Sequence, residues 1–183
     1  VEDHALVLAA ADDLVVDSGS KIAYEGSNLA IASGDTMWLA NVEIETGGNL
    51  AIASLNNLNI TSGSKITAGG GGNTPNKDLV LLYANDLINI DSVVFGTEIR
   101  EIHIDADRVL IKNVNLPSES IVRINVPGSR KWQDTNKYVT IEATNLSFTG
   151  SNPATGTVIL DNVYHPQVGT LNDSTLKEVT SGI

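Results

Sequence analysis

Carboxylate and amide side chains recur along the chain at one position of a repeating pattern. If the fold brings Asp12, Asp13 and Asp35 together, their oxygens suit Ca²⁺, because stacked carboxylates repel one another unless they are neutralised. The alternative is a ladder in which these side chains bond the backbone of neighbouring turns. We favour the ladder and retain Ca²⁺ as a candidate cofactor. The recurring pairs are Asp12-Asp13, Asp35-Thr36, Asn56-Asn57, Asn85-Asp86 and Asp107-Arg108.

A second group of titratable residues alternates with apolar ones in residues 100–108. Glu101, His103 and Asp105 stand at every second position, opposite Ile102 and Ile104. In a strand, every second side chain points to the same face, about 6.6–7 Å apart, which could form a metal or acid–base site. The simpler interpretation, which we favour, is a solvated outer face with paired charges. No serine, histidine or aspartate is marked as a catalytic residue.

A third group lies in the segment GSRKWQDTNKY, residues 128–138. Arg130, Lys131 and Trp132 are adjacent there, and a tryptophan beside basic residues can stack on a sugar ring. The alternative is that the tryptophan packs over a side of the fold. These residues are the candidate glycan contact, and they support an alternative function: a carbohydrate-binding or carbohydrate-cleaving protein of the polysaccharide-lyase kind.

Composition narrows the possible partners. The 183 residues include 22 acidic and 11 basic side chains, for a formal charge of −11. Nucleic acids and anionic membranes need basic patches, so we expect neither as a partner. Cysteine is absent, which excludes disulfides and thiolate metal sites. No apolar run approaches the length of a membrane span, so we expect no membrane insertion.

Repeated short sequences indicate the structural elements that position these candidate site residues. NLAIAS occurs at residues 28–33 and again at 49–54, with starts 21 residues apart. SGSKI occurs at residues 18–22 and 62–66, 44 residues apart, which is close to twice that interval. A fixed period of this length indicates a repeat architecture.

Alternating apolar pairs mark the first strand of each repeat. Successive pairs are 17 to 29 residues apart, and the longest interval contains the Gly/Asn/Pro-rich insertion AGGGGNTPNKD at residues 68–78. The pairs are Leu6/Leu8, Leu29/Ile31, Leu50/Ile52, Leu79/Leu81, Ile102/Ile104, Val122/Ile124, Val139/Ile141 and Val158/Leu160.

Two further short apolar elements follow in each repeat, separated by turn-forming residues. In the fourth repeat either Leu87 or Ile88 can begin the second pair, which predicts a one-residue bulge. Period-2 alternation predicts half-buried strands, so each repeat is three strands. The second pairs are Leu14/Val16, Met37/Leu39, Leu58/Ile60 and Val109/Ile111, and the third elements are Ile22, Val42/Ile44, Ile66, Val94 and Val114/Leu116.

These features predict an all-β fold, a right-handed parallel β-helix (β-solenoid) of about eight coils of roughly 20 residues. An antiparallel meander would also alternate, but it gives no reason for every third strand to look alike. Crossover connections are usually right-handed. We place the solenoid at residues 1–164. Residues 165–183 leave the repeat and are expected to cap the last coil or to contact another subunit.

The stretch NLAIASLNNLNITSGSKITAGG, residues 49–70, resembles the repeats of filamentous-haemagglutinin-type bacterial adhesins. The resemblance covers residues 5–116 well and 121–160 more loosely. It implies a right-handed parallel β-helix in a secreted or cell-surface protein of a bacterium. The NPNG-like motifs of that family's secretion domain are absent, so the resemblance implies the shaft or another part of the array rather than the secretion-signal end.

We therefore expect a non-enzymatic structural or adhesive solenoid. The first coil, VEDHALVLAA, enters the pattern without an obvious cap. Uncapped strand edges invite stacking, so self-association through the coil ends or through residues 165–183, including assembly into a filament, is one expected interaction. A surface glycan or a protein receptor is the other.

Overall fold

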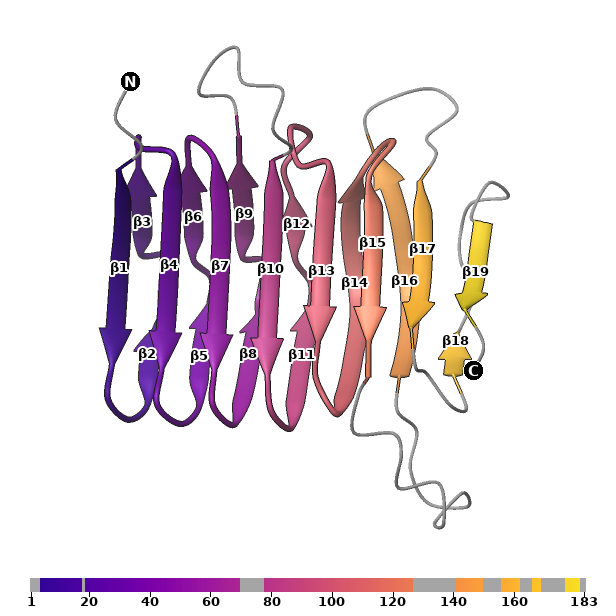
Figure 1. The fold of residues 1–183 in the computed structure, drawn as a ribbon, viewed down its shortest axis with the longest axis horizontal. Coiled ribbons are helices and arrows are strands. Elements are labelled where there is room, and N and C mark those ends of the chain that lie inside the picture. The colour runs from indigo at the N-terminus through magenta and orange to yellow at the C-terminus, as the bar shows by residue number, and fades with distance from the viewer. Residues whose placement is uncertain are drawn as a thin grey trace.

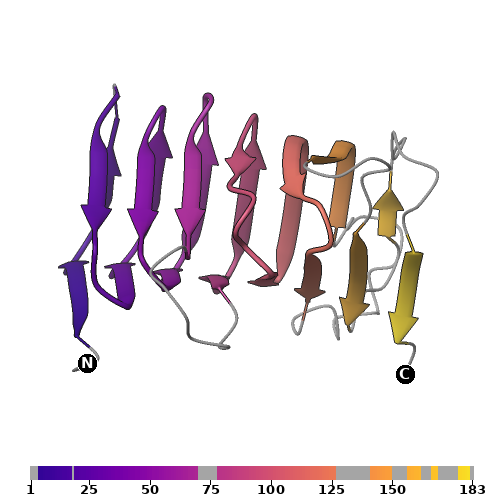
Figure 2. The same ribbon diagram turned by 90° about the horizontal axis from the view of Figure 1, so that it is seen from above.

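The computed structural model describes residues 4–17, 19–69, 78–126, 141–149, 156–161, 166–168 and 177–181. All regular structure in these ranges is β-strand. The strands wind into a β-solenoid whose two ends are marked by β1 and β19 (Figures 1 and 2). The predicted all-β parallel solenoid is therefore confirmed.

The first sheet forms one side of the solenoid. It takes one strand from each coil, and every neighbouring pair in it is parallel. Its eight strands in spatial order are β1 (Ala5–Ala10), β4 (Asn28–Ser33), β7 (Asn49–Ser54), β10 (Leu79–Ala84), β13 (Glu101–Asp105), β15 (Ile121–Asn125), β17 (Thr157–Asp161) and β19 (Lys177–Ser181).

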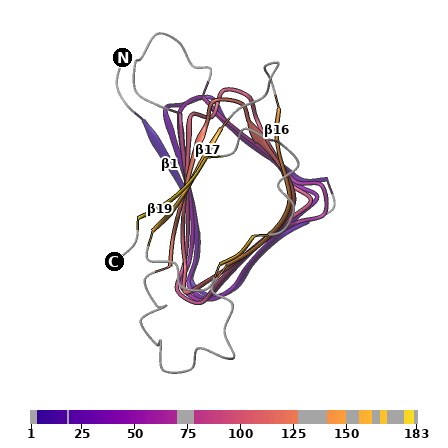
Figure 3. The ribbon, with the colours of Figure 1, turned by 90° about the vertical axis from the view of Figure 1, so that its right-hand side faces the viewer.

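The second sheet folds around the other two sides, which gives the triangular outline seen along the axis in Figure 3. The long strand β14 joins the two sides, and Asn113 lies in its middle with a φ of 53°. The path is β2 (Leu14–Val16), β5 (Met37–Ala40), β8 (Asn57–Thr61), β11 (Leu87–Asp91), β14 (Arg108–Pro117), β12 (Val94–Phe95), β9 (Lys65–Ala68), β6 (Glu43–Thr46) and β3 (Lys21–Tyr24), and β16 (Ile141–Thr149) and β18 (Pro166–Val168) extend it from β14.

About five complete turns can be followed, from β1–β3 to β13–β14. This is fewer than the eight coils predicted, although the first sheet does contain eight strands. The predicted first-strand pair Val139/Ile141 is wrong, because Ile141 lies in β16 of the second sheet, paired with Val109 of β14. The eighth strand of the first sheet is instead β19, which was not among the predicted pairs.

The inward columns are the rows of side chains that successive coils stack inside the solenoid. Both copies of NLAIAS contribute to them, with Leu29 paired to Leu50 and Ile31 paired to Ile52. These four side chains are at most 1% exposed. Parallel in-register pairing places identical side chains one above another, so the repeated words are the sequence signature of these columns.

The fourth coil corrects the sequence analysis by one residue. Val80 and Leu82 occupy the inward columns of the first sheet, whereas Leu81 is 39% exposed. The predicted pair Leu79/Leu81 is therefore wrong. A shift of one residue moves every side chain to the opposite face of a strand, so register is fixed by which alternate set is buried.

In the second strand of this coil, Ile88 is the inward member of the two alternatives, and in the third strand the register again differs by one residue. Ile88 pairs with Leu58, and the pairing from Leu87 to Ile90 is continuous, so the predicted bulge is absent from β11. Phe95 is buried where Val94 was expected, and Val94 is 40% exposed. The predicted inward position Val94 is therefore wrong.

Left-handed backbone forms the corner between the second and third strands. Asn41, Ser62, Ser92 and Asn113 have φ values between 53° and 61° there. Backbone hydrogen bonds join these corners from coil to coil, as from the amide of Asn41 to the carbonyl of Thr61 at 3.1 Å. Asparagine and serine therefore share the left-handed positions of this corner.

Two strands lie in residues 165–183, where the sequence analysis expected the repeat to end. β18 pairs parallel with β16, and β19 pairs parallel with β17. The segment thus extends both sheets at these positions. The segment has few aliphatic residues, so it lacks the apolar alternation by which the other strands were recognised. Backbone hydrogen bonding between strands does not require that alternation. Its role as a cap or a subunit contact stays a prediction.

Candidate functional site

The corner after the first strand brings three aspartates together. Asp12 and Asp13 lie between β1 and β2, and Asp35 lies between β4 and β5. One carboxylate oxygen from each side chain lies within 4.8 Å of the others. Asp12 and Asp13 are exposed and Asp35 is partly buried. The predicted convergence of these residues is confirmed, because parallel register stacks equivalent corners.

Protein donors already bond two of these carboxylates. The backbone amide of Thr36 donates to Asp13 Oδ1 at 3.0 Å. The Asn56 side-chain amide donates to Asp35 Oδ1 at 3.0 Å. Ca²⁺ prefers six to eight oxygen ligands, so three carboxylates would need several waters to complete the shell. Ca²⁺ binding here stays a prediction, which a calorimetric Ca²⁺ titration with an Asp35→Asn control would test.

The same corner continues as a polar ladder in later coils. The amide of Asp86 donates to the carbonyl of Asn56 at 3.0 Å, and the amide of Arg108 donates to the carbonyl of Asp86 at 2.8 Å. The Arg108 guanidinium also donates from Nε and Nη2 to the two carboxylate oxygens of Asp86, each at 3.2 Å. These contacts support the ladder interpretation, with arginine compensating an aspartate of the preceding coil.

The outer face of β13 pairs its charges within the sheet. His103 Nε2 lies 3.1 Å from Glu101 Oε2 on the same strand. Asn125 of the next coil donates to Asp105 Oδ2 at 2.9 Å. This geometry matches the favoured interpretation of a solvated face with paired groups.

A charged ladder on the third side was missed by the sequence analysis. Glu43 Oε1 lies 3.2 Å from Lys65 Nζ, and Glu43 Oε2 lies 3.5 Å from Lys21 Nζ. Lys21 Nζ also lies 2.7 Å from Glu45 Oε2. Lys21, Glu43 and Lys65 are spaced at 22-residue intervals, so charge alternation at the repeat period was the signal that could have revealed them.

These ion pairs shift the titration of their members. The hydrogen bond from Lys65, followed by the charge of Lys21, holds the pKa of Glu43 below its usual value of 4.5. The hydrogen bond to Glu45 raises the pKa of Lys21 above 10.5. The side chains of Lys21, Glu43, Glu45 and Lys65 are all partly exposed, so the pairs are screened by salt.

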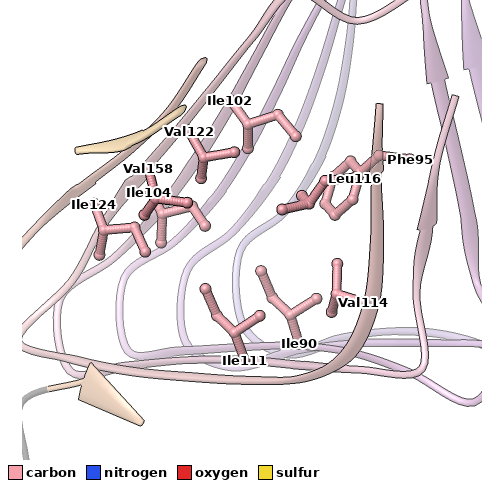
Figure 4. Close-up of a pocket in the computed structure, with 10 residues that line it drawn as sticks. All are labelled: Ile90, Phe95, Ile102, Ile104, Ile111, Val114, Leu116, Val122, Ile124 and Val158. Atoms are coloured by element: carbon pink, nitrogen blue, oxygen red, sulfur yellow. The ribbon is translucent and has the colours of Figure 1, made fainter. Parts of the chain in front are cut away.

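The interior holds a void of about 10 Å³ between the middle coils (Figure 4). That is about the space of one water molecule. Among the described residues, only apolar side chains line it and none of them would hold a polar ligand, so we interpret it as imperfect packing. The lining residues are Ile90, Phe95, Ile102, Ile104, Ile111, Val114, Leu116, Val122, Ile124 and Val158.

Arg130, Lys131 and Trp132 lie outside the described residues, so the predicted glycan contact stays a prediction. In the part of the chain that the structure describes, no helix is long and apolar enough to cross a membrane.

The chain matches no protein-family model, no curated protein and no solved structure. The structure agrees with the β-helix architecture that the adhesin resemblance implies. The more specific resemblance to filamentous-haemagglutinin-type repeats stays a prediction.

Proposed function

We propose that the chain is a non-enzymatic structural module, a β-solenoid that serves as a spacer or adhesive shaft in a secreted or cell-surface bacterial protein. The observation that supports this proposal best is the continuity of the inward columns. The first-sheet column extends in register from Leu6 through Leu29, Leu50, Val80, Ile102 and Val122 to Val158. Side chains occupy the interior in this way to hold coils together.

The polar groups of the corners support the same role. Asp13, Asp35 and Asp86 each accept hydrogen bonds from a neighbouring coil. Groups engaged in this way stabilise the stacking of coils. A shaft needs such uniform contacts between neighbours, because each coil contacts only the coils beside it.

Removal of one whole coil tests the proposal. Deletion of residues 28–48 joins Ser27 to Asn49 and keeps the register, since Asn28 and Asn49 are paired equivalents. A structural module should stay folded and shorten by about 4.8 Å, the spacing of neighbouring strands. Circular dichroism and small-angle X-ray scattering would measure both properties.

Assays of polysaccharide cleavage and glycan binding would test the alternative functions. The unmodified chain would be incubated with a panel of polysaccharides, and we expect no cleavage. Turnover that is lost in Asp12→Asn or Asp105→Asn would contradict the structural role and support the carbohydrate-cleaving alternative. A glycan array that binds the parent chain but not Trp132→Ala would support the carbohydrate-binding alternative.

A further inference from the structure

One large aromatic side chain lies on the outer face of the second sheet. Trp38 in β5 is 42% exposed, whereas its neighbours Met37 and Leu39 point inward and are 0% exposed. Among the described residues, no acceptor bonds the indole N–H of Trp38. Tryptophan offers a large apolar surface and one hydrogen-bond donor, so an exposed tryptophan is well suited to contact a ligand.

Two asparagines continue the outward column that contains this indole. Parallel register places Val15, Trp38, Asn59, Asn89 and Leu110 in one row across the strands. The strands that carry them, β2, β5, β8, β11 and β14, are neighbours in the second sheet (Figure 1). Neighbouring strands are about 4.7–4.9 Å apart. One indole and two amides are therefore presented at regular spacing on a continuous sheet face.

Hydrogen bonds within the row orient the two amides. Asn89 Nδ2 donates to Asn59 Oδ1 at 3.4 Å, and Asn59 Nδ2 donates to the main-chain carbonyl of Met37 at 3.5 Å. Each Nδ2 carries a second hydrogen, and Asn89 Oδ1 accepts no hydrogen bond from a described residue. Donors and an acceptor thus remain available to a ligand, in an orientation that is set before the ligand binds.

The order of these groups suits a chain of sugars. A β-linked pyranose has an apolar face of C–H groups that can stack on an indole, and its hydroxyls both donate and accept hydrogen bonds. An asparagine amide also does both. The rings of an extended glycan follow one another in a line. With one ring on Trp38, the next rings would lie over Asn59 and Asn89.

Charges around the row favour an uncharged ligand. The carboxylates of Asp12, Asp13 and Asp35 meet at the corners directly before β2 and β5. Asp91 lies on the same face of β11, with Lys112 opposite it in β14. Carboxylates repel uronic acids, sulfated sugars and nucleic-acid phosphates. A neutral glycan escapes this repulsion and still has the hydroxyls that the amides can bond.

We propose that Trp38, Asn59 and Asn89 form a binding site for an uncharged, extended β-linked glycan. Trp38 stacks on the face of one sugar, and the two asparagines bond the hydroxyls of the sugars that follow. Val15 and Leu110 bound the row with apolar side chains. The inference goes beyond the structural role proposed above, because a solenoid can act as a spacer with no ligand on this face.

Tryptophan fluorescence reports on this site, because the chain has only two tryptophans, Trp38 and Trp132. In a Trp132→Phe variant, the emission comes from Trp38 alone. The probes are cellohexaose, xylohexaose and chitohexaose, which are uncharged and β-linked. We expect a saturable change in emission with at least one of them. Adding Asn89→Leu should weaken that binding by roughly fivefold, the contribution of one hydrogen bond.

Calorimetry measures the variant that removes the fluorescent reporter. Trp38→Ala should bind the same probe about tenfold more weakly or worse, as expected for loss of an aromatic anchor. The matched control is Tyr83→Ala, because Tyr83 is 38% exposed on the outer face of the first sheet. It should bind the probe as the parent does. Circular dichroism would establish that both variants are folded.

Several results would overturn the proposal. These are no response of Trp38 to any of the three probes, equal losses of affinity in Trp38→Ala and Tyr83→Ala, or tighter binding of an anionic hexagalacturonate. Loss of binding in Trp132→Phe would place the glycan contact at Trp132 instead. A change in Trp38 emission that grows with protein concentration without sugar would show that a second copy covers this face. Failure of the coil-deletion test would contradict the structural role and leave the binding result unchanged.

Discussion

Left-handed backbone at the second corner sets the requirements on individual residues. At Gly63 the φ is 80°, and an added β-carbon would contact no atom within 4 Å. The position therefore isolates the conformational cost of a side chain from any steric clash with neighbours. The preceding residue, Ser62, already accepts that cost at a φ of 61°.

Gly63→Ala is therefore expected to lower the free energy of unfolding by about 1–2 kcal/mol, the cost of left-handed backbone for an L-residue. Urea denaturation followed by circular dichroism would measure it. Ser62→Gly removes strain of the same kind and should not destabilise the chain by a comparable amount. An alanine variant as stable as the parent would contradict this assignment.

The charged ladder gives the chain a defined response to pH. Because the pKa of Glu43 is lowered in the folded state, its ion pairs stabilise the fold above the unfolded value of 4.5. This contribution is lost as the pH falls through the folded pKa. Lys21 behaves in the opposite sense, because its pKa is raised: its contribution is complete below 10.5 and is lost at higher pH.

Glu43→Gln should therefore be less stable than the parent near neutral pH, and the difference should disappear in acid below the folded pKa of Glu43. Thermal unfolding across a pH series would show this. The difference should also shrink at high salt, because the pairs are exposed. A difference that persists in acid would mean that Glu43 stabilises the fold by packing.

At the scale of residues, the sequence predicted the contacts that arise when equivalent positions of successive repeats stack on one another. The convergence of Asp12, Asp13 and Asp35 followed from stacking equivalent corners. The ladder around Glu43 was not predicted, because apolar periodicity marks only the buried face of each strand, and the ladder lies on the outer face, where charge alternates at the repeat period. The partners of an exposed carboxylate depend on side-chain conformation, which no sequence pattern specifies.

The strand is the element through which one residue affects the whole fold. Ile52 in β7 is 0% exposed and stacks between Ile31 and Leu82. Ala51 on the same strand alternates to the outer face and is only partly buried. Adjacent residues of one strand thus differ in what they tolerate.

Ile52→Asp should unfold the chain, because a buried unpaired charge costs several kcal/mol and the net stability of a domain is only about 5–15 kcal/mol. Ala51→Thr should change the free energy of unfolding by less than about 0.5 kcal/mol. Chemical denaturation of both variants would test this. A folded aspartate variant would contradict the assignment of that column.

Strand positions were predicted correctly in the first three coils, where all the turns are short. The fourth coil was misplaced by one residue because its leading insertion hid where β10 begins, and Leu79, Val80, Leu81 and Leu82 are all apolar. Composition cannot choose between the two alternate sets in such a run. Only pairing with Leu50 and Ile52 of the preceding coil does so.

Stability is distributed along the whole molecule by neighbour contacts. β7 is paired on both sides, with β4 and β10, whereas among the described residues β1 is paired with β4 alone. A solenoid of this kind opens from its ends, because each coil is held only by the coils next to it.

Native-state hydrogen exchange should therefore be slowest in β7 and β8 and faster in β1, β2 and β3. Mass spectrometry of exchanged peptides would measure the gradient. A first coil as protected as the third at low protein concentration would contradict it, since the described contacts give the first coil one neighbour rather than two.

The connection before the fourth coil shows how little the rod depends on the length of its loops. Leu50 and Val80 are paired although they are 30 residues apart, whereas Leu29 and Leu50 are paired at 21. The entropic cost of a longer loop grows only slowly with its length. Foreign sequences grafted between Gly69 and Asp78 should therefore be tolerated, and arrays of such chains could display antigens or enzymes at a fixed spacing.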